Sequence, residues 1–483
     1  MKFKNVGPIN KGEITLSDMT IFFGKNGVGK TYASYVLFGI LTFLLETTPD
    51  FIKDTHIKDL VKNKEIIMNF DSTLTVVRKE LIDSVKLEMP DILSSSFNRN
   101  KNSSIGEMEV LFTEEDFINM NYFINRTELA SQDMSNIFES RFSLKLIGIE
   151  GFSEDKLYNI IFDYDSESDN IIIKLSENNY KTNVSASEKK EFDPIVLPGI
   201  DRLRGYLNGI VARQLKIPAR AVYIPAERIG INVFRNEIKN NRLNIYDQIA
   251  EKAKISHVLD QSKIDLYPSP ISSYISNLNN WGEFYEFFKN PNFVDSSESL
   301  KYAKNILETD LLKGQFYIDS DNDEIKYISK DYDTEIPLQV ASSSIKSLLG
   351  LELYLQTFAK VGDYLIIDEP ELNLHPESQK HLAILLNELV SKGLKIIIST
   401  HSDYLIRELI NLELKKNIKN KQNKEGEEKL KSTIAYDFVD NTIKEISNIH
   451  NQSVIHNFDD LTLEIEDEYY DLLAEYQDLL EGE

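Results

Sequence analysis

The chain of 483 residues contains no cysteine and no long apolar run. The absence of cysteine excludes disulfides and thiolate metal sites, although it says nothing about compartment. The longest apolar stretch, Tyr35–Leu45, is shorter than the roughly 18 residues that a membrane-spanning helix needs, so we expect a buried helix there. The first residues also lack the apolar core of a signal peptide. We therefore expect a soluble, cytoplasmic protein without a membrane partner.

Positive charge is scarce. The formal net charge is -24, and residues 459–483 hold eleven acidic residues and no Lys or Arg, which leaves -13 (24 minus 11) for residues 1–458. Affinity for DNA comes largely from Lys and Arg contacts to phosphates, so this balance disfavours broad DNA binding. A local basic groove remains open as an alternative, and DNA as a partner stays uncertain.

A glycine-rich segment follows the apolar strand expected at Thr20–Phe23 and precedes a helix expected at Lys30–Glu46. This strand–loop–helix context is the one in which the G-x-x-x-x-G-K-[ST] pattern cradles nucleotide phosphates with its backbone N–H groups. Lys30 is expected to reach the β- and γ-phosphates, and the Thr31 hydroxyl to ligate Mg²⁺. The predicted nucleotide-binding residues are Gly24, Lys25, Asn26, Gly27, Val28, Gly29, Lys30 and Thr31.

A second apolar strand, Leu365–Ile367, ends in Asp368 and Glu369, 338 residues after Lys30. Ligands bind at the carboxyl ends of strands in doubly wound sheets. Asp368 is expected to hold the magnesium through water, and Glu369 to orient or deprotonate the attacking water. A further strand, Lys395–Ser399, leads to His401, whose imidazole is expected to donate to the γ-phosphate and sense its presence.

A serine-rich segment, Ala341–Leu349, leads into a helix expected at Ile345–Ala359. The free N–H groups and the dipole of such a helix start suit an anion. A simple helix cap is the alternative, because serine favours that position in any case.

The order of these motifs, with IIDEPELNLHP after the second strand and STHS after the third, resembles ABC-type ATPases of the SMC, RecF and OLD kind. Their signature, Leu-Ser-Gly-Gly-Glu-Lys-Ser-Leu, aligns with Ala341–Leu348, where two serines replace the glycines and Ile345 replaces the glutamate. The resemblance implies a signature that acts across a dimer on the partner's γ-phosphate, made by Ser342, Ser343, Ser344 and Lys346. The family's glutamine has one candidate here, Gln214, and the motif Tyr223–Arg228 looks like a family feature without an evident chemistry.

The same resemblance implies an α/β fold, an ABC-type ATPase head with a mixed sheet, an antiparallel β lobe and a helical insert. Strand patterns at Lys2–Val6 and Glu13–Leu16, and β-rich runs at 65–78, 108–123 and 142–175, would build the head and its lobe. The expected divisions are 1–229 (first part of the head with the lobe), 230–312 (helical insert), 313–458 (second part of the head) and 459–483 (acidic tail). The lysine-rich stretch Lys415–Lys431 is interpreted as a solvated loop.

Three features of the sequence disfavour particular classes of ATPase. The 338-residue gap disfavours a transporter subunit, no heptad pattern supports an SMC-type arm, and the 82 residues after His401 are too few for the nuclease domain of OLD proteins. The segment IIDEPELNLHP has His375 where transporter ATPases have Asp, and in this it is similar to OLD-like and stand-alone ATPases of prokaryotic defence systems. The lack of visible effector chemistry and the acidic amphipathic tail suggest an ATPase component that resembles PtuA of Septu or AriA of PARIS.

We therefore expect an ATP- and Mg²⁺-dependent ATPase that forms a homo-oligomer and controls a separate nuclease or toxin in anti-phage defence. The alternatives are a RecF- or SMC-like ATPase of DNA repair or recombination, and a regulatory NTP-binding module with little turnover. In the tail, Leu472, Tyr476, Leu479 and Leu480 share one helical face, which either contacts a basic partner or another subunit, or packs on the chain's own core.

Overall fold

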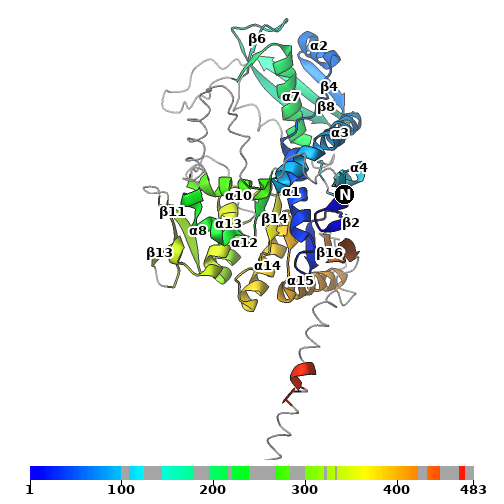
Figure 1. Cartoon of the computed structure of the whole chain (residues 1–483). Helices are drawn as coiled ribbons and strands as arrows, with labels where there is room; N and C mark the ends of the chain where they lie inside the picture. The colour runs from blue at the N-terminus through cyan, green and yellow to red at the C-terminus, as the bar shows by residue number, and fades with distance from the viewer. Residues whose placement is uncertain are drawn as a thin grey trace, which may run out of the picture. The chain divides into compact units, whose positions relative to one another are not determined.

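The computed structural model describes residues 1–98, 108–120, 122–124, 144–177, 195–215, 220–238, 267–282, 300–319, 324–331, 334–422, 432–446, 467–470 and 472–473. The chain forms two compact units (Figure 1). The first comprises Met1–Thr42, Met89–Leu111 and Pro218–Glu483, and the second Phe43–Glu88 and Phe112–Ile217. Among the described residues, none of the helices combines the length and the apolar character needed to cross a membrane.

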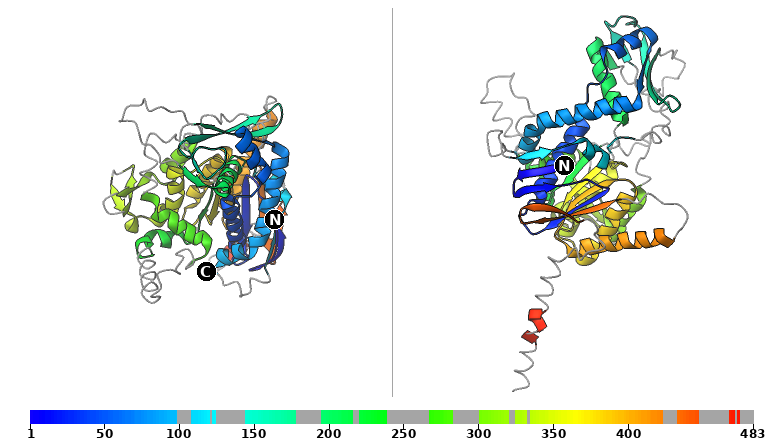
Figure 2. Two further views of the ribbon diagram at one scale, coloured as in Figure 1. Left: turned by 90° about the horizontal axis from the view of Figure 1, so that it is seen from above. Right: turned by 90° about the vertical axis from the view of Figure 1, so that its right-hand side faces the viewer.

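The first unit is built on a nine-stranded mixed sheet. The strands β10, β14, β15, β3 and β16 run parallel, and the remaining neighbours are antiparallel except for β17 and β2. Figure 2 shows strands β1 and β2 beside the hairpin β16–β17, which comes from the opposite end of the chain. In spatial order the strands are β10 (Ala221–Ile224), β14 (Tyr364–Asp368), β15 (Lys395–Ser399), β3 (Met19–Gly24), β16 (Thr433–Val439), β17 (Thr442–Ile446), β2 (Ile9–Glu13), β1 (Lys2–Val6) and β5 (Glu109–Leu111).

Strands β3, β14 and β15 are buried along their whole length, as expected for parallel strands covered on both faces. The phosphate loop follows β3, Asp368 ends β14 and Ser399 ends β15. Because these three strands are parallel and adjacent, all three groups lie at the same end of the strands. The helices of this unit include α1 (Lys30–Glu46, shared with the second unit), α8 (Arg228–Val233), α10 (Ser269–Asn279), α12 (Lys301–Ile306), α13 (Ser343–Thr357), α14 (Pro376–Ser391) and α15 (Asp403–Gln422).

One core cluster joins the sheet to these helices. Apolar side chains of α10, α12, α13 and α14 pack with those of β3, β14 and β15, and Trp281, which follows α10, is part of the same cluster. A small antiparallel sheet, formed by β11 (Gly314–Asp319), β12 (Glu324–Ser329) and β13 (Glu335–Pro337), contributes Phe316 and Tyr327 to it. The described helices within 230–312, expected as an insert, thus share the core of the first unit.

The second unit contains a five-stranded sheet that is antiparallel except for one pair, β6 and β9. In spatial order its strands are β4 (Glu65–Asn69), β8 (Asn170–Glu177), β7 (Leu157–Asp165), β6 (Leu144–Ile147) and β9 (Ile195–Pro198). The helices of the unit include α2 (Asp54–Asn63), α4 (Glu114–Asn119), α7 (Ile200–Leu215) and most of α3 (Phe70–Phe97). Gln214, the glutamine candidate, lies near the end of α7.

The mixed α/β fold with an antiparallel lobe is confirmed, while several local expectations are wrong. Residues 70–78 are helical rather than extended, because Phe70, Leu74 and Val77 recur at helical spacing and are buried on one face of α3. The strand expected at Glu13–Leu16 ends at Glu13, and α15 continues through residue 422 into the stretch interpreted as a loop.

Most of the acidic tail lies outside the described residues, including Tyr476, Leu479 and Leu480. Within the described part, Tyr469, Tyr470 and Leu472 are exposed. The two interpretations of the tail therefore remain predictions.

Candidate nucleotide-binding site

The loop between β3 and α1 is shaped by its glycines. Gly24 has φ 130°, and a Cβ there would lie 2.5 Å from the carbonyl oxygen of Phe438 on β16, so only glycine fits this close approach. Gly27 has φ 78°, and a Cβ there would meet nothing within 4 Å. The loop thus leaves open space above its backbone at the N-terminus of a 17-residue helix, which is the environment that favours a phosphate.

Lys30 lies inside this loop. Its Nζ donates to the carbonyl oxygens of Gly24 and Lys25, each at 2.9 Å, and the residue is almost fully buried. Burial lowers the pKa of Lys30 to about 8, although the nearby carboxylates of Glu369 and Asp368 oppose this shift. Lys30 is therefore a cation held in a desolvated position, where an added anion interacts with it more strongly than in water.

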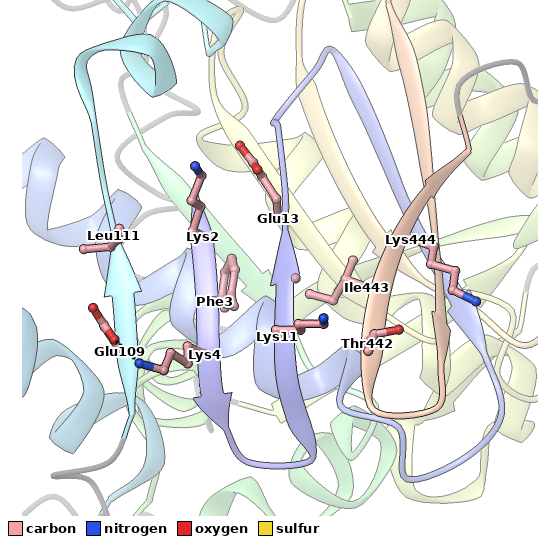
Figure 3. Close-up of a pocket in the computed structure, with 11 residues that line it drawn as sticks. Lys2, Phe3, Lys4, Lys11, Glu13, Glu109, Leu111, Thr442, Ile443 and Lys444 are labelled. Atoms are coloured by element: carbon pink, nitrogen blue, oxygen red, sulfur yellow. Dashed lines mark hydrogen bonds and ion pairs between the residues drawn. The ribbon is translucent and has the colours of Figure 1, made fainter.

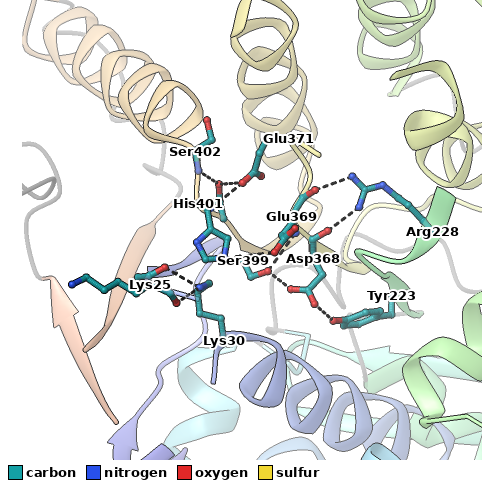
Figure 4. Close-up of polar contacts among 12 residues, drawn as sticks. Lys25, Lys30, Tyr223, Arg228, Asp368, Glu369, Glu371, Ser399, His401 and Ser402 are labelled. Atoms are coloured by element: carbon teal, nitrogen blue, oxygen red, sulfur yellow. Dashed lines mark hydrogen bonds and ion pairs between the residues drawn. The ribbon is translucent and has the colours of Figure 1, made fainter. Parts of the chain in front are cut away.

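Asp368, the last residue of β14, is held from both neighbouring strands (Figure 4). Ser399 of β15 donates its Oγ proton to Oδ1, and Tyr223 of β10 donates from its hydroxyl to Oδ2 at 3.0 Å. Burial and the adjacent Asp368 carboxylate raise the pKa of Tyr223 well above its ordinary value, so this hydroxyl stays protonated and remains a donor. The orientation of the carboxylate is thus set by two side chains.

Glu369 follows in a left-handed conformation, with φ 47°. For a residue other than glycine this conformation costs on the order of 1–3 kcal/mol, and such strain is common at functional sites. The Glu369 N–H donates to the carbonyl oxygen of Ser399 at 3.0 Å. Partial burial and the carboxylates of Asp368 and Glu371 raise the pKa of Glu369, which makes it a better proton acceptor at neutral pH.

His401 faces Glu369 from the loop after β15. Its Nε2 lies 3.6 Å from Oε1 of Glu369. Burial, together with the charge of Lys30, lowers the pKa of His401 to about 4, so at neutral pH this is a polar contact of a neutral imidazole and not an ion pair. Glu371 fixes the His401 loop, because its Oε1 accepts from the His401 N–H and from the Thr400 hydroxyl, both at 2.8 Å.

These groups converge on one cavity of about 300 Å³. The phosphate loop, Glu369 and His401 all border it, whereas Asp368 lies beneath Ser399 and is nearly inaccessible. The lining residues are Pro8, Asn26, Gly27, Gly29, Lys30, Thr31, Tyr32, Glu369, Ser399 and His401. The expected phosphate-loop and catalytic residues are thus brought together within the first unit.

The serine-rich helix start has a different setting. Ser342 caps α13 by accepting from the Ile345 N–H at 3.3 Å, its Oγ lies 2.9 Å from that of Ser344, and Ser342 and Ser343 are exposed. The Lys346 Nζ donates to the Gln339 carbonyl oxygen at 2.7 Å. None of these residues is among those that line the cavity beside Lys30. His375 caps α14 in a similar way, since its Nδ1 accepts from the Glu377 N–H at 3.3 Å.

Sequence reasoning missed several residues of this site. Tyr223, Ser399 and Glu371 hold the carboxylate of Asp368 and the His401 loop, and Arg228 binds the backbone around Glu369. The position of Ser399 at the end of a strand beside β14 was a usable signal, since parallel strand ends meet at one edge. The contacts of Glu371 depend on side-chain geometry that no pattern indicated.

This arrangement defines a nucleotide-binding site of the phosphate-loop type. The model of the AAA ATPase domain family matches residues 1–406, and the chain therefore belongs to this family. No curated protein matches the chain.

The solved structures that are similar to the chain include three SMC heads. The Smc head domain of Pyrococcus furiosus with an extended coiled coil, bound to the C-terminal domain of ScpA, is 12% identical, with a TM-score of 0.32 and coverage of 92% of this chain and 94% of that one. The SMC head domain from Thermotoga maritima is 10% identical, with a TM-score of 0.30 and coverage of 92% and 96%. An SmcHead bound to the C-winged helix domain of ScpA is 13% identical, with a TM-score of 0.32 and coverage of 92% and 95%. The family assignment rests on the family model.

Proposed function

We propose that the chain binds ATP with Mg²⁺ and hydrolyses it to ADP and phosphate. The observation that carries this proposal is the meeting of Lys30, Thr31, Glu369 and His401 around one cavity. The open space above Gly27 suits a phosphate group, and Thr31, which borders the cavity, offers a hydroxyl of the hard oxygen type that Mg²⁺ prefers, while the buried carboxylate of Asp368 would act on the metal through water. When bound, the metal would neutralise charge on the phosphate oxygens.

The roles of the protein groups follow from their positions. Lys30 binds the phosphates as a point charge, and the loop N–H groups position them. Glu369 accepts a proton from the attacking water, for which its raised pKa suits it. Neutral His401, beside both Glu369 and Lys30, can donate one hydrogen bond to the γ-phosphate or to the water.

The test is phosphate release by wild type and Glu369→Gln. The variant should bind ATP and turn it over about 100- to 10,000-fold more slowly, the usual contribution of a general base. Glu388→Gln is the matched control, because Glu388 lies on α14 and pairs with Lys392. Equal turnover in Glu369→Gln and wild type would remove Glu369 from the catalytic role.

We also propose that the site is completed by the α13 start of a second copy. The exposed serines at this helix start, which are absent from the cavity of their own chain, support the proposal. Lys30→Met and Ser342→Arg should each be inactive, and a mixture should regain roughly a quarter of wild-type turnover, since half of randomly paired dimers would hold one intact site of two. An inactive mixture would contradict a composite site.

For the biological role we propose the sensor or switch subunit of an anti-phage defence system that controls a separate nuclease or toxin. The sequence IIDEPELNLHP and its His375 support this role through their resemblance to defence ATPases. The measurement is phage plating on cells that carry the gene with its neighbours. Protection should be lost in Lys30→Met, and protection by that variant equal to wild type would refute ATP-dependent control.

One observation favours a DNA-linked function as the second candidate. The exposed face of β5, β1, β2 and β17 is hollowed by a cavity of about 800 Å³ (Figure 3), where Lys2, Lys4, Lys11 and Lys444 outnumber Glu13 and Glu109. This is a local basic surface on an acidic chain. Duplex binding that weakens steeply with salt, and that is lost in Lys11→Glu with Lys444→Glu, would favour a RecF-like role.

A further inference from the structure

The motif Tyr223–Arg228 places a buried arginine behind the carboxylates of the site. Arg228 is the first residue of α8, and its side chain is almost completely inaccessible. Its Nε donates to the carbonyl oxygen of Ser347 at 2.9 Å. Its Nη1 donates to the carbonyl oxygen of Asp368 at 2.9 Å, and its Nη2 to that of Glu369 at 2.8 Å (Figure 4). Longer contacts reach the carbonyls of Pro225 and Pro370. One guanidinium thus binds three separate segments of the chain, namely Pro225 before α8, the turn 368–370 at the end of β14, and Ser347 in α13.

The stability that a buried cation of this kind contributes depends on the partners that replace its water. Taking a guanidinium out of water is costly, and apolar groups of the same volume often replace buried charges without loss of stability. The partners of Arg228 are backbone carbonyls, and the carboxylates of Glu371, Asp368 and Glu369 lie close enough to favour its charge. The planar, five-donor geometry of arginine is therefore used to hold backbone in place.

The backbone that Arg228 binds includes the strained residue Glu369. Glu369 adopts its left-handed φ of 47° between two carbonyls, those of Asp368 and Glu369, which both accept from Arg228. Fixing these two peptide groups fixes the direction in which the Glu369 side chain leaves the backbone. That direction sets its distance to His401 and its position in the cavity.

The third segment is the start of α13. Ser347, whose carbonyl accepts from Arg228, lies five residues after the cap Ser342. Asn232 of α8 adds a parallel link, because its Nδ2 donates to the Lys346 carbonyl at 2.9 Å and its Oδ1 accepts from the Tyr274 hydroxyl at 2.8 Å. Helix α8 therefore connects the turn that carries Glu369 to the first turns of the serine-capped helix.

We propose that Arg228 is a positioning residue that sets the orientation of Glu369 and couples it to the start of α13. This inference rests on the proposed ATPase function. In it, a shift of the α13 start, such as contact with another copy would produce, is transmitted through Arg228 and Asn232 to the turn that holds the general base. Arg228 itself touches neither the cavity nor the nucleotide, since it is not among the lining residues.

The test compares Arg228→Lys with Arg235→Lys in the full chain. Lysine keeps the charge but donates from a single nitrogen, so it cannot reproduce the contacts that Nε, Nη1 and Nη2 of Arg228 make. Arg228→Lys should bind ATP within about twofold of wild type and lose at least about tenfold in kcat, because a misplacement of about 1 Å can cost 100-fold. Arg235 is the matched control, a buried arginine of the same region whose Nη1 donates to the Leu278 carbonyl of α10. Its variant should keep its kcat.

Two results would overturn the inference: wild-type kcat in Arg228→Lys, or a loss of ATP affinity and melting temperature that matches the loss of kcat. If Arg228→Lys does not fold, Asn232→Ala provides the same test. Because this variant loses the hydrogen bond to the Lys346 carbonyl, its kcat should be about 3- to 10-fold lower at unchanged ATP affinity. An unchanged kcat would contradict the inference. Wild type and Glu369→Gln are measured in parallel. An inactive wild type refutes the ATPase function itself, whereas an active wild type with an active Arg228→Lys refutes only the coupling.

Discussion

Removal of one hydroxyl, in Tyr223→Phe, tests how the Asp368 carboxylate, which we propose acts on the metal, is held. The Tyr223 hydroxyl donates to Oδ2 of Asp368 at 3.0 Å inside the protein. A hydrogen bond to a charged partner is worth about 1.5–3 kcal/mol, so the melting temperature should fall by several degrees. Partners that orient a metal ligand typically contribute 10- to 100-fold to metal affinity. The Mg²⁺ concentration that half-saturates ATP hydrolysis should therefore rise by about 10- to 100-fold.

Tyr354→Phe is the matched control. Tyr354 is equally buried, and its hydroxyl donates to Oδ2 of the buried Asp363 at 3.1 Å, but Asp363 precedes β14 and so lies at the opposite end of this strand from Asp368. Both variants should be destabilised, and only Tyr223→Phe should require more Mg²⁺. Equal Mg²⁺ dependence in the two variants would refute the view that Tyr223 orients the ligand.

Further predictions concern Lys30, His401 and Gly24. Lys30→Met should abolish ATP binding and leave the melting temperature of the nucleotide-free protein equal or higher, because it removes a desolvated cation whose pKa burial lowers to about 8; a clear drop would contradict this. The pKa of His401 is about 4 in the folded chain against an ordinary 6.5, so the unfolded chain binds the proton more readily. The stability that depends on neutral His401 is thus fully present above pH 6.5 and lost as the pH falls towards 4, and melting curves of His401→Gln should lack this acid-dependent loss. Gly24→Ala should unfold at lower temperature and bind ATP poorly, because its Cβ would lie 2.5 Å from the Phe438 carbonyl oxygen; binding measured by calorimetry at wild-type strength would refute the steric reasoning.

Local patterns predicted much of the fold and its order. Strands β3, β14 and β15 and helix α1 were foreseen because each contains a contiguous apolar run with clear boundary residues, and β1 because apolar residues recur within a short run. Helix α3 was not, because its first residues are β-branched and apolar enough to suggest strands, and only the burial of one face distinguishes the two. A prediction made from a few consecutive residues reflects their local propensity, whereas packing against the rest of the protein decides whether they form a helix or a strand.

The candidate site was likewise predicted only in part from the sequence. The phosphate loop and the Asp368–Glu369 pair were recognised from spacing, whereas Tyr223 and Arg228 stood in a noted motif without an assigned chemistry. Their role became visible once β10 was placed beside β14, in the register that pairs Tyr223 with Ile366. Pairing between strands that lie 140 residues apart cannot be obtained from either segment alone, because many registers satisfy the apolar pattern equally well.

The strand that carries the phosphate loop has neighbours from the far end of the chain. β3 (Met19–Gly24) pairs on one side with β15 and on the other with β16, and the carbonyl of Phe438 closes against Gly24. During synthesis, β3 emerges first and remains without either partner until more than 370 further residues have been translated. Contacts of such sequence separation are slow to form and leave edges exposed in the meantime. A nascent chain that stops before Thr433 would carry the whole nucleotide motif while β3, the strand that leads into it, still lacks β16 on one side.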